Sequence, residues 1–276
     1  MKYSDSYAPI GLGQIERERL SKLLRNTQTT ISVSEAAEIL GLSTIQAAKI
    51  LALYNKKGWL RHIYQGLYLP VPLDSPTNEI IAEEPFVIAQ KIFSPCYIAG
   101  MNAANHWDLT EQIFQSITIM TQKQIKERTP EIAGAHYNIH TIHPRYFFGL
   151  KPVWFNNVKV NISDPTRTIV DMMLFPQFCG GLNFICDVLK NYFNSKYKDT
   201  DLLVNYLEKT ENGAALKRAG FLIEKYYPDE SKLINFCLNN ITKGYSKIIP
   251  KIENRSLVRR WNLWVPTHWK EKAHDN

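Results

Sequence analysis

Cysteine is scarce in this chain, and its four copies among 276 residues are widely spaced: Cys96, Cys179, Cys186 and Cys237. No zinc or redox motif has this spacing, and scattered cysteines of this kind indicate reduced thiols. Long hydrophobic runs are also missing, since none approaches the roughly 20 residues that span a bilayer. Residues 1–14 lack the basic-then-apolar pattern of a secretory signal. We therefore expect a cytoplasmic protein without a membrane partner.

The sequence also lacks the signatures of common catalytic sites. Residues 11–13 are Gly-Leu-Gly without the further glycine of a dinucleotide-binding turn, and no Gly-Lys-Ser/Thr triplet forms a phosphate loop. A nucleotidyltransferase needs a Gly-Ser pair followed by metal-binding carboxylates, and the chain has neither. We therefore predict a protein that is not an enzyme and that needs no cofactor.

Two small groups of residues invite a metal-binding or hydrolytic interpretation. His136 and His140 fall in a predicted strand, where residues four apart lie about 13 Å from each other and cannot share an ion. No cysteine or carboxylate pair nearby completes a metal site. Asp164 and Asp171 resemble a hydrolase pair, but Asp164 is more simply a helix cap and no acidic-x-lysine strand motif follows. We predict no metal site and keep a DNA-associated nuclease as an alternative.

Charge is unevenly distributed along the chain. The formal net charge is +7, with 33 basic and 26 acidic residues. Residues 1–75 carry 9 basic and 6 acidic side chains, residues 76–175 carry 8 and 9, and residues 176–276 carry 16 and 11. A positive protein attracts nucleic acid before other anionic partners. The length and the 45% hydrophobic content predict two or three modules with packed cores.

Residues 1–75 have the pattern of a winged helix-turn-helix. Apolar spacing predicts a helix over 12–26, and Ser32 with Glu35 forms a capping box that starts a second helix. Gly41 ends that helix, and Ser43 with Gln46 caps a third, whose apolar stripe recurs at helical spacing. Residues 59–64 and 67–69 then predict two strands joined by a tight turn, which is the expected wing.

The third helix and the wing supply the predicted DNA contacts. An α-helix fits the major groove, where its first residues reach base edges and its free N–H groups favour phosphates. Gln46 is expected to bond adenine, although a purely capping role stays open, and basic side chains are expected on the phosphates. The predicted DNA-binding residues are Ser43, Thr44, Gln46, Lys49, Lys56, Lys57, Arg61, His62 and Gln65. Winged helices also serve as protein-interaction modules, so that alternative stays open.

The rest of the chain predicts a mixed module over 76–175 and a helical module over 176–276, after a linker at 74–78. The expected fold class is therefore α/β (α+β). In the middle module, residues 85–93 favour a helix, 97–106 a helix or a strand-helix junction, 116–120, 137–142 and 158–162 strands, and 166–174 a helix. Helices are expected at 182–193, 201–210 and 214–226. Lys217, Arg218 and Lys225 give the last of these a positive surface, which is either a solvated face or a surface for an acidic partner or for phosphates.

The most specific motif lies at residues 147–171. It comprises Phe-Phe-Gly at 147–149, Val-Trp at 153–154, and Val-Asn-Ile-Ser-Asp-Pro-Thr-Arg-Thr-Ile-Val-Asp at 160–171. This stretch resembles the central signature of AbiEi-type antitoxins. Cys-Gly-Gly-Leu at 179–182, Leu-Lys-Arg-Ala-Gly-Phe-Leu-Ile-Glu at 216–224 and Trp-Asn-Leu-Trp-Val-Pro at 261–266 are similar to further segments of that family. One departure is Thr166, where the family usually has a glutamate.

The resemblance implies a function. AbiEi-type proteins repress the promoter of a type IV toxin-antitoxin operon, and they neutralise a nucleotidyltransferase-like toxin encoded beside them. The expected partners are therefore double-stranded DNA with inverted repeats and that toxin, and residues 76–276 are the expected antitoxin region. The alternative is a winged-helix interaction protein of a phage-defence locus that does not repress.

Overall fold

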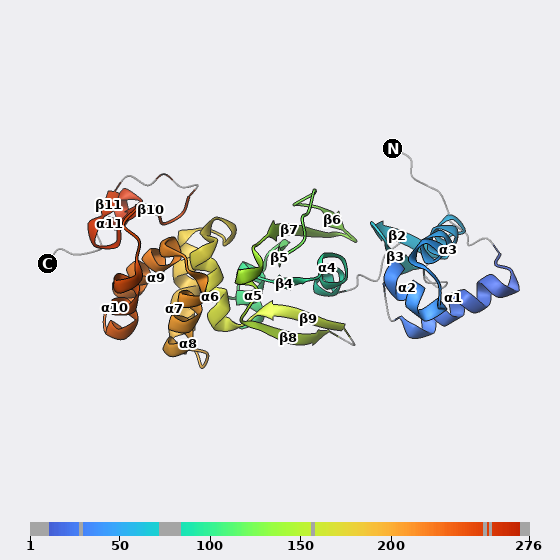
Figure 1. The fold of residues 1–276 in the computed structure, drawn as a ribbon, viewed down its shortest axis with the longest axis horizontal. Coiled ribbons are helices and arrows are strands. Elements are labelled where there is room, and N and C mark those ends of the chain that lie inside the picture. Colours follow the sequence, from blue (N-terminus) through green and yellow to red (C-terminus); the bar gives the residue numbers. More distant parts are fainter. Residues whose placement is uncertain are drawn as a thin grey trace.

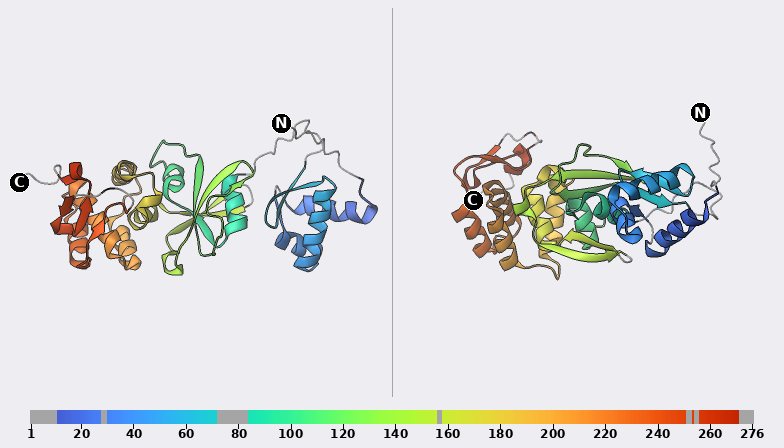
Figure 2. Two further views of the ribbon diagram at one scale, coloured as in Figure 1. Left: turned by 90° about the horizontal axis from the view of Figure 1, so that it is seen from above. Right: turned by 45° about the vertical axis from the view of Figure 1, so that its right-hand side comes forward.

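The computed structural model describes residues 11–27, 30–71, 84–155, 158–250, 253 and 256–270. This part of the chain contains eleven α-helices and three β-sheets, which confirms the mixed α/β class expected from the sequence. The elements follow one another along an elongated molecule (Figure 1). An N-terminal unit lies at one end, a six-stranded sheet in the middle, and a helical region at the other end, and two further views show the same order (Figure 2).

The N-terminal unit combines three helices with a small antiparallel sheet of order β1-β3-β2. Both predicted capping boxes form: Glu35 N donates to Ser32 Oγ over 3.1 Å, and Gln46 N donates to Ser43 Oγ over 3.3 Å. Gly41 is left-handed, with φ of 65°, as its position after the second helix predicts. The elements are α1 (Gln14–Asn26), β1 (Ile31–Ser32), α2 (Val33–Leu40), α3 (Thr44–Lys56), β2 (Leu60–Tyr64) and β3 (Leu67–Pro70).

The middle of the molecule is a mixed sheet of order β6-β7-β5-β4-β9-β8. β5 runs parallel to β7 and β4 runs parallel to β9, whereas the other neighbours are antiparallel. The three predicted strands are confirmed as β5, β7 and β9. The elements are α4 (Pro85–Phe93), β4 (Cys96–Ile98), α5 (Gly100–His106), β5 (Ser116–Thr121), β6 (Glu131–Ile132), β7 (Ala135–Thr141), β8 (Leu150–Phe155), β9 (Val158–Ser163) and α6 (Pro165–Leu174), with the short 3-10 helix η1 (Pro144–Tyr146).

The two faces of this sheet belong to different hydrophobic cores. In β4, Cys96 and Ile98 pack in a cluster with α4, whereas Tyr97 packs in a second cluster with the helices that follow the sheet. This alternation is the period-two pattern of a strand that is buried on both faces. The sheet therefore lies between α4 on one side and the helical region on the other.

The C-terminal region holds four longer helices and a small sheet of order β10-β12-β11. Its predicted helices are confirmed as α7, α8 and α9. Gly220 in α9 packs so closely under Trp261 that a Cβ there would lie 2.0 Å from the indole, so no larger residue fits. The elements are η2 (Pro176–Phe178), α7 (Leu182–Phe193), α8 (Thr200–Thr210), α9 (Gly213–Tyr226), α10 (Ser231–Asn240), β10 (Ser246–Lys247), β11 (Ser256–Val258), η3 (Arg259–Trp261), β12 (Leu263–Val265) and α11 (Thr267–Lys270).

One core runs through the middle and the C-terminal region. Met120 of the sheet and Ile169 of α6 belong to the same buried cluster as residues of α7 to α11. The expected boundary between residues 175 and 176 thus falls inside this cluster. The expected boundary at 75/76 and the linker at 74–78 lie outside the described residues.

The N-terminal unit is docked on α4. Lys91 Nζ of α4 donates to the Thr30 carbonyl over 2.8 Å and lies 3.5 Å from a Glu35 carboxylate oxygen. The rings of Tyr64 and Phe93 meet edge to face at 5.8 Å. Figure 1 shows α4 between the sheet and the N-terminal unit. The β2–β3 hairpin therefore has one side on the middle module and one side free of it.

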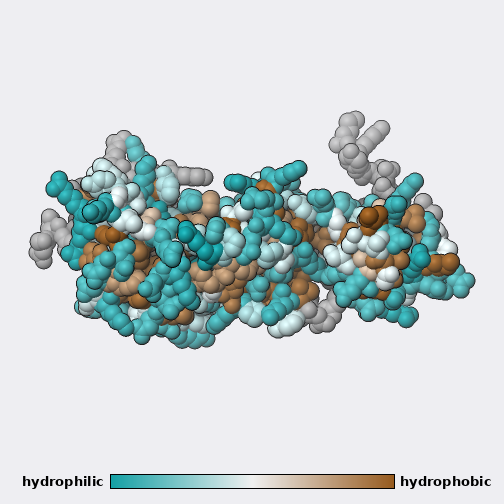
Figure 3. Space-filling view, in the orientation of Figure 1, coloured by the Kyte–Doolittle hydropathy of each residue, from teal (hydrophilic) through white to brown (hydrophobic). Residues whose placement is uncertain are grey.

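No single helix in the described part of the chain is long and apolar enough to cross a membrane. α2 and α3 reach the required length and hydropathy only when counted together, across a bend of 107°. The visible face of the molecule is largely hydrophilic and carries only small hydrophobic patches (Figure 3).

Candidate nucleic-acid interface

α2 and α3 meet at the angle and with the turn that a helix-turn-helix requires. Their axes are bent by 107°, within the roughly 90–120° typical of that motif. The left-handed Gly41 makes the bend, and Leu42 N donates back to the Ala37 carbonyl over 2.9 Å. The buried side of α3 consists of Ala47, Leu51 and Tyr54. The opposite side of α3 consequently faces solvent.

The exposed side of α3 contains most of the predicted DNA-binding residues. Thr44, Gln46, Lys49 and Lys56 are all exposed, as is the N-cap residue Ser43. Between residues 44 and 70 the chain has four basic side chains and no acidic one. This segment is therefore positive by itself, as contact with phosphates requires.

Gln46 has a second role that limits its use as a base contact. Its side-chain oxygen Oε1 accepts from Ser43 N over 3.1 Å and lies 3.0 Å from Ser43 Oγ. A bidentate bond to adenine needs both the oxygen and the nitrogen of the carboxamide. The oxygen of Gln46 is already occupied by the capping box.

Lys57 differs from the other predicted lysines because it is largely covered. Its Nζ lies 2.6 Å from Glu16 Oε2 of α1. The hydrogen bonds from Lys57 and from the Gly13 backbone lower the pKa of Glu16 below its usual value. Lys57 ties α3 to α1, so it is a weaker candidate for phosphate contact than Lys49 or Lys56.

The predicted contacts of the β2–β3 hairpin are open to solvent. Arg61, His62 and Gln65 are exposed. Arg61 and His62 pair in regular register with Leu69 and Tyr68, so they lie on opposite faces of the hairpin, and both are exposed. The His62 backbone N–H donates to Asn55 Oδ1 of α3 over 2.8 Å, which fixes the hairpin beside that helix. This bond places β2 beside the C-terminal half of α3.

The predicted partner surface on α9 is wrong in two of its three residues. Lys217 is 1% exposed and Arg218 is 6% exposed. Lys217 Nζ donates to Thr242 Oγ1 and to the Gly244 carbonyl, while Arg218 donates to the carbonyls of Met173 and Lys247 over 2.7 and 3.0 Å. The physical reason is that α9 is buried continuously from Ala215 to Ile223, so these charges have no route to solvent. They bind backbone carbonyls of other segments.

Lys225, the third residue of that predicted surface, is half-buried. Its Nζ donates to the Trp269 carbonyl over 3.4 Å and lies 5.2 Å from the centre of the Trp269 ring. It also belongs to the packing of α9 on the C-terminal segment.

The AbiEi-like motif of α6 forms a buried polar cluster. Asp164 caps α6 by accepting from Arg167 N over 2.7 Å, which confirms the predicted cap, and it accepts from Tyr206 Oη over 2.8 Å. Arg167 Nη2 lies 2.8 Å from Asp171 Oδ1, and both side chains are fully buried. The Tyr97 hydroxyl of β4 donates to the same carboxylate oxygen over 3.1 Å. These carboxylates thus hold the sheet and the helical region together.

The histidines of β7 lie apart from any such cluster. His140 stacks on Phe178 at 3.5 Å between ring centres, and His136 lies 4.0 Å from a Glu131 oxygen on the adjacent strand. Among the described residues, no group of three or more His, Cys, Asp or Glu side chains is placed to hold a metal ion.

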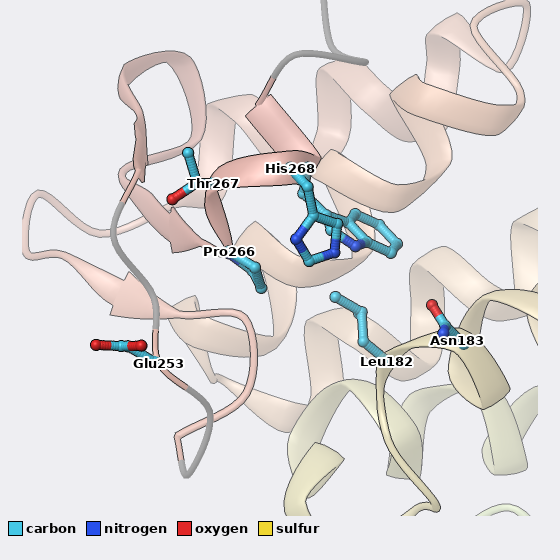
Figure 4. Close-up of a pocket in the computed structure, with 7 residues that line it drawn as sticks. Leu182, Asn183, Glu253, Pro266, Thr267 and His268 are labelled. Atoms are coloured by element: carbon cyan, nitrogen blue, oxygen red, sulfur yellow. The ribbon is translucent and has the colours of Figure 1, made fainter.

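A cleft of about 450 Å³ lies between the start of α7 and α11. In Figure 4, Leu182 and His268 point toward one another across it. Its lining is Leu182, Asn183, Glu253, Pro266, Thr267, His268 and Trp269. The ionisable residues in that lining are Glu253 and His268.

Comparison with known proteins finds no family model and no curated protein that matches the chain. The AbiEi resemblance therefore depends on the sequence motifs alone.

One exposed apolar residue on this side of α3 was missed from the sequence. Ile45, in the first turn of α3, is 70% exposed. A signal was available, because Ile45 lies outside the stripe of Ala47, Ile50, Leu51 and Tyr54 that predicts the buried face.

Proposed function

We propose that this protein is a cytoplasmic winged-helix repressor that binds the DNA upstream of its own gene, and the antitoxin of an AbiEi-type, type IV toxin-antitoxin pair. In this proposal it has no catalytic activity. Its partners are double-stranded DNA with inverted repeats and a nucleotidyltransferase-like toxin.

The observation that carries the DNA-binding part is the free side of α3. α3 is capped at its N-terminus, its outer side is exposed from Ser43 to Lys56, and the β2–β3 hairpin lies beside it. Lys49, Lys56 and Arg61 supply positive charge there, and no acidic residue lies between 44 and 70. A helix with these properties fits the major groove with phosphates on both sides.

The antitoxin part is supported by the motif resemblance. Its most specific piece, residues 164–171, caps α6 and supplies the buried Arg167–Asp171 pair between the sheet and the helical region. The motif thus lies at a structural centre of the region that the proposal assigns to neutralisation, residues 76–276.

The first experiment measures binding to DNA from upstream of the chain's own gene at several salt concentrations. The double variant Lys49→Ala, Arg61→Ala is expected to bind more weakly, with a log-log salt slope lower by roughly 0.9 for each phosphate that the protein no longer neutralises. Lys232→Ala is the matched control, because Lys232 is an exposed lysine of α10 paired with Asp201. An unchanged slope in the double variant would remove α3 and the hairpin as the DNA surface.

The second experiment separates repression from neutralisation in the full chain. The same double variant is co-expressed with the product of the adjacent gene, and promoter activity is followed in the same cells. We expect the promoter to be released while growth stays protected. Protection without any DNA binding by the wild type would favour the alternative, a winged-helix interaction protein that does not repress.

A further inference from the structure

The first turn of α3 exposes a large apolar side chain where a soluble helix normally has a polar one. Ile45 is 70% exposed, directly between Thr44 and Gln46. Isoleucine has a lower helix propensity than alanine or glutamine, and at this position it buries little surface in return. Local folding therefore gives no reason for isoleucine at position 45.

Its neighbour Gln46 is held by the N-terminal cap. The Gln46 oxygen is occupied by the backbone N–H and the hydroxyl of Ser43, at 3.1 and 3.0 Å. Ile45 has no such partner to hold it, since its side chain is hydrocarbon. Of these two adjacent residues, Ile45 is the one whose side chain is entirely available to a ligand.

The surroundings of Ile45 identify the kind of ligand. Lys49 and Lys56 follow it by four and eleven residues, about one and three helical turns, so all three share the exposed side of α3. A hydrocarbon side chain that shares one side of a helix with two lysines fits a surface that offers a methyl group near phosphates. In the major groove only thymine has such a group, its C5-methyl.

We propose that Ile45 is a specificity-determining residue that contacts the C5-methyl group of thymine in the major groove. The proposal rests on the DNA-binding function proposed above and adds the base that α3 recognises. Ile45 excludes water from the thymine methyl, while Lys49 and Lys56 contact phosphates and hold α3 in register. Gln46 acts on this contact through the cap, by fixing the first turn that carries Ile45.

The test uses DNA from upstream of the chain's own gene, amplified once with dTTP and once with dUTP. The two products have the same sequence and differ in the thymine methyl groups. Wild type is expected to bind the thymine product about four-fold more tightly for each methyl contacted, which corresponds to about 0.8 kcal/mol for one buried carbon. Ile45→Ala is expected to bind both products equally. Because alanine is the better helix former, this variant keeps α3 folded.

Ile15→Ala is the matched control, since Ile15 is also an exposed isoleucine, at 65%, but lies on α1. It is expected to keep the wild-type preference for thymine. Equal binding of both products by wild type would overturn the role of Ile45 and leave the DNA-binding function standing. An undiminished preference in Ile45→Ala would overturn it as well. If wild type binds neither product, the proposed DNA-binding function itself fails, and the role of Ile45 fails with it.

Discussion

Helices α3 and α9 both carry basic residues, and they place those charges in opposite environments. In α3, Lys49 and Lys56 stand opposite a narrow buried stripe and reach solvent. In α9, Lys217 and Arg218 lie in a run buried from Ala215 to Ile223. A helix with one buried side presents its charges to a partner, whereas a helix buried all round must satisfy them internally. Whether a helix presents basic side chains to solvent therefore depends less on its number of lysines and arginines than on how much of its surface is buried.

In α6 the charged side chains of Arg167 and Asp171 are fully buried. We expect the largest loss of stability from a substitution in this pair. Arg167→Met leaves the Asp171 carboxylate buried at 0% exposure without its counter-charge. Removing one partner of a buried pair costs about 3–5 kcal/mol. We expect a loss of this size in the free energy of unfolding at pH 7, measured by urea titration. Arg145→Met is the control, because Arg145 and Glu211 form an exposed pair worth less than about 1 kcal/mol. Equal losses of unfolding free energy in the two variants would contradict the difference between buried and exposed charges.

Asp171 adds a pH dependence to the buried cluster. Burial raises its pKa from 3.8 to about 6, although Arg167 and the Tyr97 hydroxyl act to lower it. Because the pKa is higher in the folded than in the unfolded state, the associated stability is complete below pH about 4 and is lost as the pH rises through 6. The loss is at most about 3 kcal/mol.

The measurement is urea unfolding of wild type and Asp171→Asn between pH 4 and pH 7. The variant lacks the titrating group, so the free energy of wild type minus that of the variant should fall as the pH rises. Asp201→Asn, at an exposed position, should give a difference with little pH dependence. A wild-type advantage that grows with pH would mean that Arg167 outweighs burial and that the carboxylate is stabilised.

The sequence predicted the features that depend on neighbouring residues and missed those that depend on residues far apart in the chain. The caps at Ser32 and Ser43 and the turn at Gly41 depend on residues within one helical turn of each other, so local patterns were sufficient. Strands β5, β7 and β9 alternate and were recognised, whereas β8 contains Pro152 and was not. Lys217 finds its partners 25 and 27 residues downstream, and Arg167 meets Tyr97 across 70 residues. Such distant pairings cannot be read from spacing, and the predicted surface on α9 failed for that reason.

Two single substitutions, one in α9 and one in α3, test the contrast between these helices directly. Arg218→Met leaves the carbonyls of Met173 and Lys247 without their donor. A charged hydrogen bond is worth about 1.5–3 kcal/mol, but burial disfavours the charge itself and lowers the pKa of Arg218 to about 10. We expect a net loss of about 1–3 kcal/mol in thermal or urea unfolding. Lys49→Met should leave stability within about 0.5 kcal/mol and weaken DNA binding. A large loss of stability in Lys49→Met, with none in Arg218→Met, would contradict the exposed position of Lys49 and the buried position of Arg218.

The smallest effect is expected where the two regions meet. Lys91 donates to the Thr30 carbonyl and approaches Glu35; the Lys91 side chain is 11% exposed, but that of Glu35 is 39% exposed. The N-terminal unit has a buried cluster of its own, which includes Leu23, Leu51 and Tyr54, so its folding does not depend on Lys91. We expect Lys91→Ala to lower the free energy of unfolding by about 1 kcal/mol or less. The salt slope of DNA binding should be unchanged, because the exposed side of α3 does not include this contact. A slope reduced as much as in Lys49→Ala would mean that docking on α4 orients α3 on DNA, and the charges of α3 would then not act independently of the middle module.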